Sequence, residues 1–147
     1  MAVSSRFAVA VHVMAMLAAS RAAPQTSDAL AQAAATNPVV VRRLLGGLSK
    51  AGLVRTRLGK GGGTELARGA KKITLADIYK AVETPGLIPQ SRTPPAPDSP
   101  VGRQIQPALR EIGDAAEAAF LATLEAVTLK QLLKGMLAAD ASAKRAA

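Results

Sequence analysis

The 147-residue sequence has no cysteine and a single histidine. Without cysteine the chain cannot form disulfides, thiolate metal ligands or a thiol redox sensor. The lone His12 lies in an apolar segment, so we expect it to hydrogen-bond a neighbour in the core rather than to act as a base or a ligand. No catalytic constellation and no soft-metal site can be built from what remains. We therefore expect a protein that is not an enzyme and that holds no metal and no cofactor.

Aromatic residues and long apolar runs are also scarce. The only aromatic side chains are Phe7, Tyr79 and Phe120, so the core must come from Ala, Leu, Val and Ile, which suits closely packed helices. Base stacking on single-stranded nucleic acid or RNA needs more aromatic side chains. The apolar start of the chain is similar to a secretory signal peptide, but His12 interrupts it. No run approaches the roughly 20 apolar residues of a membrane span, and we expect a cytoplasmic protein without a membrane partner.

Acidic residues are nearly missing from the first half of the chain. Residues 1–72 contain eleven Lys and Arg against two acids, whereas residues 73–147 contain eight of each. The whole formal charge of +9 therefore belongs to the first half. A basic surface of this kind displaces counterions from nucleic-acid phosphates. Charge alone leaves ribosomal and membrane-surface binding open as alternatives.

Two short helices joined by a tight turn are predicted after an apolar first helix over residues 3–20. Thr26 or Ser27 can cap the first of the two. The turn ends at Asn37, which can accept the free amide hydrogens of the next helix, and Pro38 suits its first position. That second helix ends at Gly52. The pattern is that of a helix-turn-helix.

The second of these helices has two distinct faces. Apolar side chains recur at helical spacing on one of them: Val41, Leu44, Leu45 and Leu48. The other face carries Val39, Arg42, Arg43, Gly46 and Lys50. Arg42 and Arg43 can each span a guanine edge or a phosphate, and Asn37 and Val39 lie where such a helix approaches bases. Gly46 and Gly47 each cost the helix roughly 1 kcal/mol relative to Ala, so we expect a close backbone approach to offset that cost.

A basic hairpin is predicted after Gly52. Residues 53–58 alternate, with Val54, Thr56 and Leu58 on one side and Arg55 and Arg57 on the other. The tip is Gly59-Lys60-Gly61-Gly62-Gly63, and residues 64–67 return as a second strand. Lys60 is not followed by Ser or Thr, so the glycine run does not fit a nucleotide-binding Walker loop. Arg55, Arg57 and Lys60 could instead track a DNA backbone or enter a minor groove.

The second half of the chain predicts an arm. Thr74 and Asp77 form a possible capping box for a helix to about Val82, and six of the nine prolines then lie between Pro85 and Pro100. A long helix follows from about residue 101, with Pro107 in its first turn or at a kink. Its apolar stripe exceeds what a small core can cover, which indicates a homodimer: Ile105, Leu109, Ile112, Ala116, Phe120 and Leu124. A short terminal helix and a frayed tail complete the chain.

We therefore predict a mainly α fold with a small β-hairpin. The winged helix-turn-helix occupies residues 1–83, a proline-rich loop residues 84–100, and the dimerisation and C-terminal helices residues 101–147. The predicted DNA-binding residues lie on the two short helices and the hairpin: Thr26, Ser27, Asn37, Pro38, Val39, Arg42, Arg43, Lys50, Arg55, Arg57, Lys60, Gly61 and Gly62.

Four segments resemble the Rrf-two family of bacterial winged-helix transcription regulators: NPVVVRRLL (37–45), LSKAGLV (48–54), GKGGGT (59–64) and ITLADIYKAVE (73–83). The resemblance implies a homodimeric DNA-binding regulator, usually a repressor, that dimerises through its long C-terminal helix. Members that sense through an iron-sulfur cluster or a thiol carry cysteines near the loop before that helix. This chain has none there and resembles a cluster-free member. Leu58 and Thr64 also replace the Arg and Tyr that usually flank the glycines of the wing.

The leading hypothesis is a dimeric repressor that binds an inverted repeat in double-stranded DNA, with recognition helices about 34 Å apart. The alternative is a non-specific nucleic-acid-binding or architectural protein that uses its basic half as a clamp. An unidentified small-molecule effector is a further possible partner. Its pocket would lie between the dimer helix and the helix-turn-helix, with the proline-rich loop as the moving part.

Overall fold

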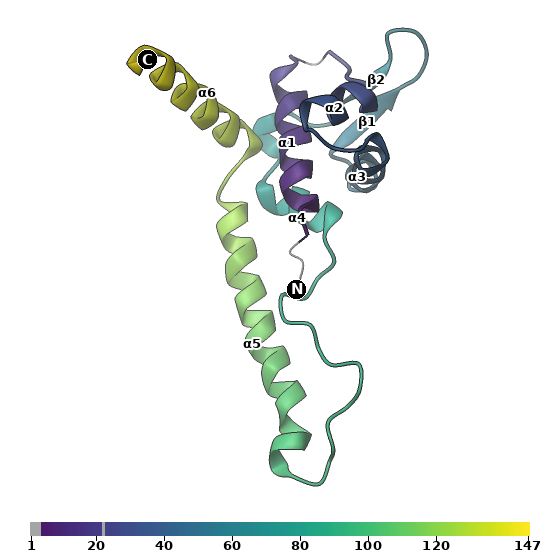
Figure 1. Cartoon of the computed structure of the whole chain (residues 1–147), viewed down its shortest axis with the longest axis vertical. Helices are drawn as coiled ribbons and strands as arrows, with labels where there is room; N and C mark the ends of the chain where they lie inside the picture. The colour runs from purple at the N-terminus through teal and green to yellow at the C-terminus, as the bar shows by residue number, and fades with distance from the viewer. Residues whose placement is uncertain (1–3, 22) are drawn as a thin grey trace.

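The computed structural model describes residues 4–21 and 23–147. Four helices and a hairpin gather in one bundle, from which two longer helices project in different directions (Figure 1). In chain order the elements are α1 (Arg6–Ala19), α2 (Ser27–Ala33), α3 (Pro38–Lys50), β1 (Val54–Arg57), β2 (Gly63–Leu66), the 3-10 turn η1 (Ala70–Lys72), α4 (Leu75–Val82), α5 (Pro100–Glu125) and α6 (Leu129–Ala146). The mainly α fold with a small hairpin is the one that the sequence predicts.

Helix α1 lies at the centre of the bundle and packs on α3, α4, α6 and β2. Its inward side is fully buried: Ala10, Val13, Met14, Ala15 and Leu17. The predicted helix begins at Val3, which lies outside the described residues. The prediction that His12 is a core residue is wrong. His12 is exposed, and it lines an open groove between α1 and α6 because α6 crosses that side of α1 without covering it.

Side-chain caps begin α2, α3 and α4. Thr26 Oγ1 accepts a hydrogen bond from the Ala29 amide at 3.1 Å, and Asn37 Oδ1 accepts one from the Val39 amide at 2.8 Å. Thr74 and Asp77 form a complete capping box at the start of α4. A cap of this kind is worth about 0.5–2 kcal/mol. The three predicted helix starts are therefore confirmed.

The two glycines of α3 have different surroundings. A Cβ atom on Gly47 would lie 2.7 Å from the Ala81 carbonyl oxygen of α4, whereas one on Gly46 would meet nothing within 4 Å. The predicted close backbone approach thus exists at Gly47 only. Because glycine has no side chain there, α3 and α4 can pack with their backbones nearly in contact.

This difference between the glycines gives a matched pair of variants. Gly47→Ala should lower the free energy of unfolding by about 1–3 kcal/mol because the added methyl group collides with backbone. Gly46→Ala should raise it by up to about 1 kcal/mol because alanine is the better helix former. Urea unfolding followed by circular dichroism measures both. Equal shifts for the two variants would contradict the packing described here.

The hairpin is antiparallel, with Val54 opposite Leu66 and Arg57 opposite Gly63. Its second strand is also hydrogen-bonded to the connection between α1 and α2: the backbones of Gln25 and Thr64 exchange hydrogen bonds of 2.9 and 2.8 Å. Gly63 has φ +150°, and a Cβ atom there would lie 2.7 Å from the Gln25 carbonyl oxygen. Glycine at this position therefore allows the hairpin, which we call the wing (residues 54–66), to dock beside α2.

The three aromatic residues of the chain meet at one place. The Tyr79 ring of α4 lies 5.4 Å from the Phe7 ring of α1 and 5.0 Å from the Phe120 ring of α5, both edge to face. Burial, together with the nearby charges of Glu117 and Glu83, raises the pKa of the Tyr79 hydroxyl above its usual value. Each edge-to-face pair adds about 0.5–1.5 kcal/mol beyond burial of its area. The aromatic cluster thus connects the bundle to α5.

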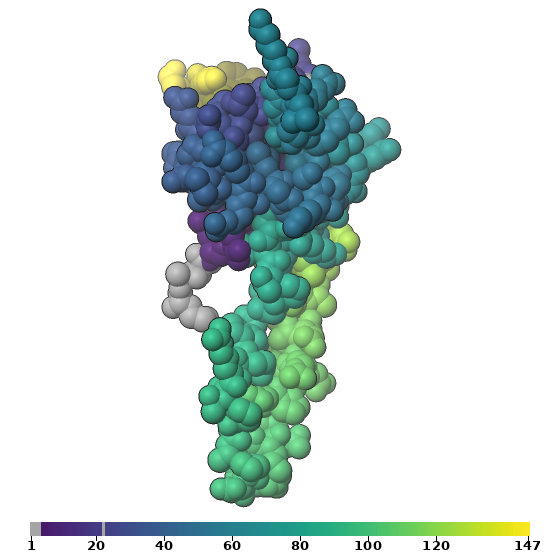
Figure 2. All heavy atoms as spheres, turned by 90° about the vertical axis from the view of Figure 1, so that its right-hand side faces the viewer, coloured from purple at the N-terminus to yellow at the C-terminus, as the bar shows by residue number. Residues whose placement is uncertain are grey.

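Helix α5 and residues 84–99 form a narrow arm (Figures 1 and 2). Residues 84–99 form neither helix nor strand, yet hydrogen bonds attach them to α5. The Gly86 amide donates to the Glu117 carboxylate at 3.0 Å, and Arg103 donates to the Pro97 carbonyl oxygen at 2.7 Å. Pro107 lies inside α5, which excludes the first turn among the two predicted alternatives. The helix starts at Pro100, next to the predicted residue 101, because Ser99 caps it and Pro100 occupies its first position.

The apolar stripe of α5 is only partly covered. Phe120 and Leu124 are half-buried near α4, whereas Ile105, Leu109 and Ile112 are 39%, 37% and 58% exposed and Ala116 is exposed as well. Helix α6 has 18 residues, so it is longer than the predicted short helix with a frayed tail. Its alanine-rich end favours helix without needing an apolar stripe. Among the described residues no helix is both long and apolar enough to cross a membrane.

Candidate nucleic-acid interface

The outward face of α3 is open to solvent. All five residues predicted for that face are exposed: Val39, Arg42, Arg43, Gly46 and Lys50. The opposite stripe is buried through Val41, Leu44 and Leu48, while Leu45 is half-buried. Val40, which the pattern does not place outward, is also exposed. The N-terminal end of α3 thus presents two valines and two arginines next to its cap, Asn37.

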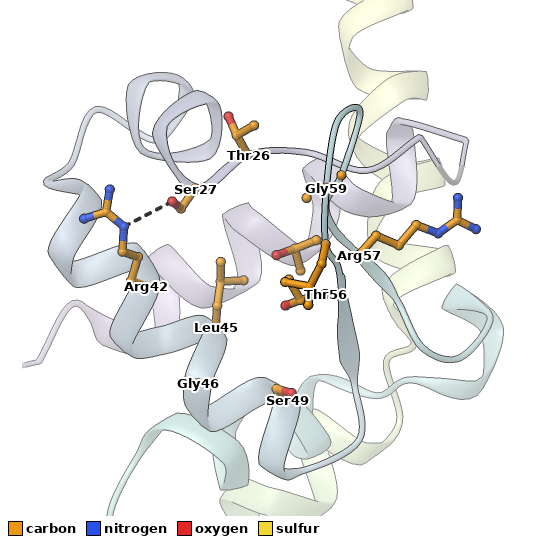
Figure 3. A pocket seen from close by; sticks show the side chains of 13 residues that line it. Thr26, Ser27, Arg42, Leu45, Gly46, Ser49, Thr56, Arg57 and Gly59 are labelled. Atoms are coloured by element: carbon orange, nitrogen blue, oxygen red, sulfur yellow. Dashed lines mark hydrogen bonds between the residues drawn. The ribbon is translucent and has the colours of Figure 1, made fainter.

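A groove of about 590 Å³ separates α3 from the wing (Figure 3). Hydroxyl-bearing residues of α2 with its cap, of α3 and of both strands of the wing line it: Thr26, Ser27, Ser49, Thr56 and Thr64. Leu45 and Gly46 of α3 and glycines of the wing complete the lining. Because a Cβ atom on Gly46 would meet nothing within 4 Å, the helix surface is open here. The groove contains several hydroxyl groups and has the Arg42 guanidinium at its edge. These groups can donate hydrogen bonds to phosphate oxygens.

The structure brings together only part of the predicted DNA-binding set. Thr26, Ser27, Arg42, Arg57 and Gly62 border the groove, although the side chain of Arg57 points away from it. The other predicted residues lie on α3 or the wing outside that lining: Asn37, Pro38, Val39, Arg43, Lys50, Arg55, Lys60 and Gly61. Sequence reasoning missed the contributions of Ser49, Thr56 and Thr64. Helical spacing could have found Ser49, because it lies seven residues after Arg42 and therefore on the same side of α3.

Arg42 bridges α2 and α3. Its Nε donates to Ser27 Oγ at 3.3 Å, and its Nη2 lies 3.1 Å from Asp28 Oδ1 (Figure 3 shows the first contact). Both members of the ion pair are well exposed, and such pairs are worth about 0–1 kcal/mol. The guanidinium is therefore oriented at the edge of the groove by contacts that a stronger acceptor could replace.

Arg55 and Arg57 share one buried carboxylate on the outer face of the wing. Their Nε atoms lie 2.6 and 3.2 Å from the same oxygen, Oε1 of Glu65, whose side chain is only 3% exposed. The hydrogen bond from Arg55, with the charges of both arginines, lowers the pKa of Glu65 although burial opposes this shift. Figure 3 shows the Arg57 side chain pointing away from the groove, as the predicted alternation requires.

Glycines shape the tip of the wing. Gly59 and Gly61 have φ of +88° and +75°, and a Cβ atom on Gly62 would collide with the Arg57 carbonyl oxygen. The turn exposes Lys60 and also Leu58, which is 93% exposed. The tip therefore combines one cation with one unprotected apolar side chain.

Comparisons with known proteins agree with this geometry. Residues 3–135 match the family Rrf2, described as "Iron-dependent Transcriptional regulator". YwnA of Bacillus subtilis (strain 168), described as a candidate HTH-type transcriptional regulator, is 32% identical over 131 residues, which are 89% of this chain and 96% of YwnA.

Two crystal structures are similar over nearly the whole chain. One is of a candidate DNA-binding protein, with 32% identity, a TM-score of 0.71 and coverage of 88% of this chain and 99% of the other. The second is of a candidate transcriptional regulator from Lactobacillus plantarum, with 28% identity, a TM-score of 0.75 and coverage of 90% and 89%. The fold of most of the chain is thus shared with these proteins.

The residues of this chain do not fit the iron that the family description names. The sequence has no cysteine and one histidine. Within residues 4–21 and 23–147 there is also no group of three or more His, Cys, Asp or Glu side chains that could hold a metal ion. The match therefore concerns the fold and the helix-turn-helix rather than an iron site.

Proposed function

Because the chain belongs to the Rrf2 (Rrf-two) family of transcriptional regulators, we propose that this regulator is a homodimeric repressor that binds an inverted-repeat operator in double-stranded DNA. Residues 1–83 would read the DNA, and residues 101–147 would hold two copies together. Residues 84–100 would brace the dimer helix.

The observation that carries this proposal is the open face of α3 beside the groove. Asn37, Pro38, Val39, Arg42 and Arg43 lie at the end of α3 that meets base edges when such a helix enters a major groove. Around that end, phosphate contacts would come from both sides of the groove: Thr26, Ser27, Lys50, Arg55, Arg57, Lys60, Gly61 and Gly62. The net charge of the first half supports the same assignment, since it favours phosphate binding at this surface.

The exposed part of the α5 stripe supports the dimer. Ile105, Leu109, Ile112 and Ala116 form a continuous exposed apolar face along the arm, away from α4. A second copy of the same helix matches this face in length and in apolar character. Phe120 and Leu124 would extend the interface toward the bundle. A two-fold dimer places its recognition helices about 34 Å apart on one side of the duplex.

A competition titration tests the proposal. The purified protein selects a duplex from a random pool, and that duplex then competes at fixed salt with a scrambled duplex of the same length. A specific repressor should prefer the selected duplex at least about 1,000-fold, select an inverted repeat, and lower transcription from a promoter carrying it. A ratio near one, without a repeat, would support the non-specific architectural protein instead.

A small-molecule effector between α5 and the helix-turn-helix stays a prediction.

A further inference from the structure

The wing contains a buried acid on a surface that is otherwise basic. Glu65 is one of only two acidic residues among the first 72, and it lies on β2 directly opposite Arg55. A buried carboxylate is costly unless it is paired and hydrogen-bonded. Its charge also reduces the positive charge of a surface proposed to bind phosphates. A role limited to attracting DNA therefore does not account for Glu65.

The contacts of Glu65 suggest what the acid does. Both arginines reach its Oε1 atom through Nε, the inner nitrogen of the guanidinium. The two outer nitrogens of each group remain available, and the Arg55 and Arg57 side chains are 62% and 60% exposed. Those outer nitrogens form the fork that binds phosphate oxygens in pairs. One carboxylate thus holds two arginines by their inner edges and leaves both forks facing solvent.

We infer that Glu65 is a positioning residue that orients Arg55 and Arg57 to bind neighbouring phosphates of one DNA strand. The two arginines are two residues apart on one strand face, about 6.6 Å along the chain. Free arginine side chains lose rotamer freedom on binding, and a side chain that is already held loses less. The outer face of the wing would thus contact backbone beyond the groove. This inference rests on the proposed function, because it assumes that the wing meets DNA.

The test variant is Glu65→Gln, because charge and positioning predict opposite changes in its affinity for DNA. The substitution raises the net charge by one from +9, so charge alone would tighten DNA binding. Loss of positioning instead should weaken binding of a 30-base-pair random duplex about tenfold and reduce the salt dependence of the affinity. Lys60→Ala is the control at the wing tip. It should remove about 0.9 from the slope of log affinity against log salt whether or not Glu65 is present.

A second background separates positioning from folding. In a protein that carries Arg55→Ala and Arg57→Ala, Glu65→Gln should not weaken DNA binding, because the acid positions only these arginines and its removal otherwise adds positive charge. A loss of affinity in that background would mean that Glu65 merely supports the hairpin, and it would overturn the inference. Equal or tighter binding by the single Glu65→Gln variant would overturn it too. Failure of the wild-type protein to bind the duplex would instead reject the proposed function.

Discussion

Replacing Ile112 by glutamate should convert the proposed dimer into monomers and lower affinity for the selected operator more than about a hundredfold. Ile112 is 58% exposed and lies in the exposed part of the apolar stripe of α5. A dimer would bury two new carboxylates, one from each subunit, without a cation to pair with them. Each unpaired buried charge costs several kcal/mol. A monomer also loses the gain from holding two half-sites at once. Sedimentation velocity gives the oligomeric state, and a gel-shift titration gives the affinity.

Ala118→Glu is the matched control for this experiment. Ala118 is exposed and lies nine residues after Leu109, on the side of α5 opposite the apolar stripe. The same charge placed there should leave both the dimer and the operator affinity unchanged. A dimer that survives Ile112→Glu would show that copies of the chain associate through a different surface.

Arg42→Ala should reduce discrimination between the operator and scrambled DNA about 5- to 150-fold, the range expected for one bidentate base contact. Arg42 is oriented at the edge of the groove by Ser27 and Asp28. These exposed contacts are weak enough for a guanine edge to replace them. Parallel titrations on the two duplexes measure the ratio. Equal loss on both duplexes would indicate that Arg42 contacts phosphate only.

Asp28→Asn is the corresponding control, since it removes the ionic partner of Arg42 but keeps the arginine. If Arg42 reads a base directly, this variant should bind both duplexes slightly more tightly and discriminate between them as well as the wild type. Discrimination lost to the same extent as in Arg42→Ala would mean that the bridge between α2 and α3, rather than a base contact, carries specificity.

Local signals in the sequence were sufficient for most of the fold. Asn37-Pro38 and the Thr74–Asp77 pair predict helix starts because capping depends on a few consecutive residues. The alternation of Arg55 and Thr56 likewise predicts which side chains share a face of the wing. Local signals did not decide every case: the sequence allowed Pro107 either in the first turn of the long helix or at a kink, and it lies well inside α5.

The contacts that organise the candidate site could not be predicted in this way. The favourable effect of an acid in the first turn of α2 is enough to explain Asp28 from the sequence. Nothing in the sequence indicates that it pairs with Arg42, fourteen residues away. Glu65 meets Arg55 only because the glycine turn fixes the register of the hairpin. The exposure of His12 depends on where α6 crosses α1, and helical spacing does not report that crossing. Tertiary placement decides all three cases.

The aromatic cluster also has a practical consequence. The chain has no tryptophan, and Tyr79 is its only tyrosine. Its near-ultraviolet spectrum therefore arises almost entirely from one side chain, which lies between Phe7 of α1 and Phe120 of α5. Any displacement of α5 relative to the bundle changes the environment of that ring. The unmodified protein thus carries its own optical probe at the joint between the bundle that would read DNA and the helix that would pair two copies.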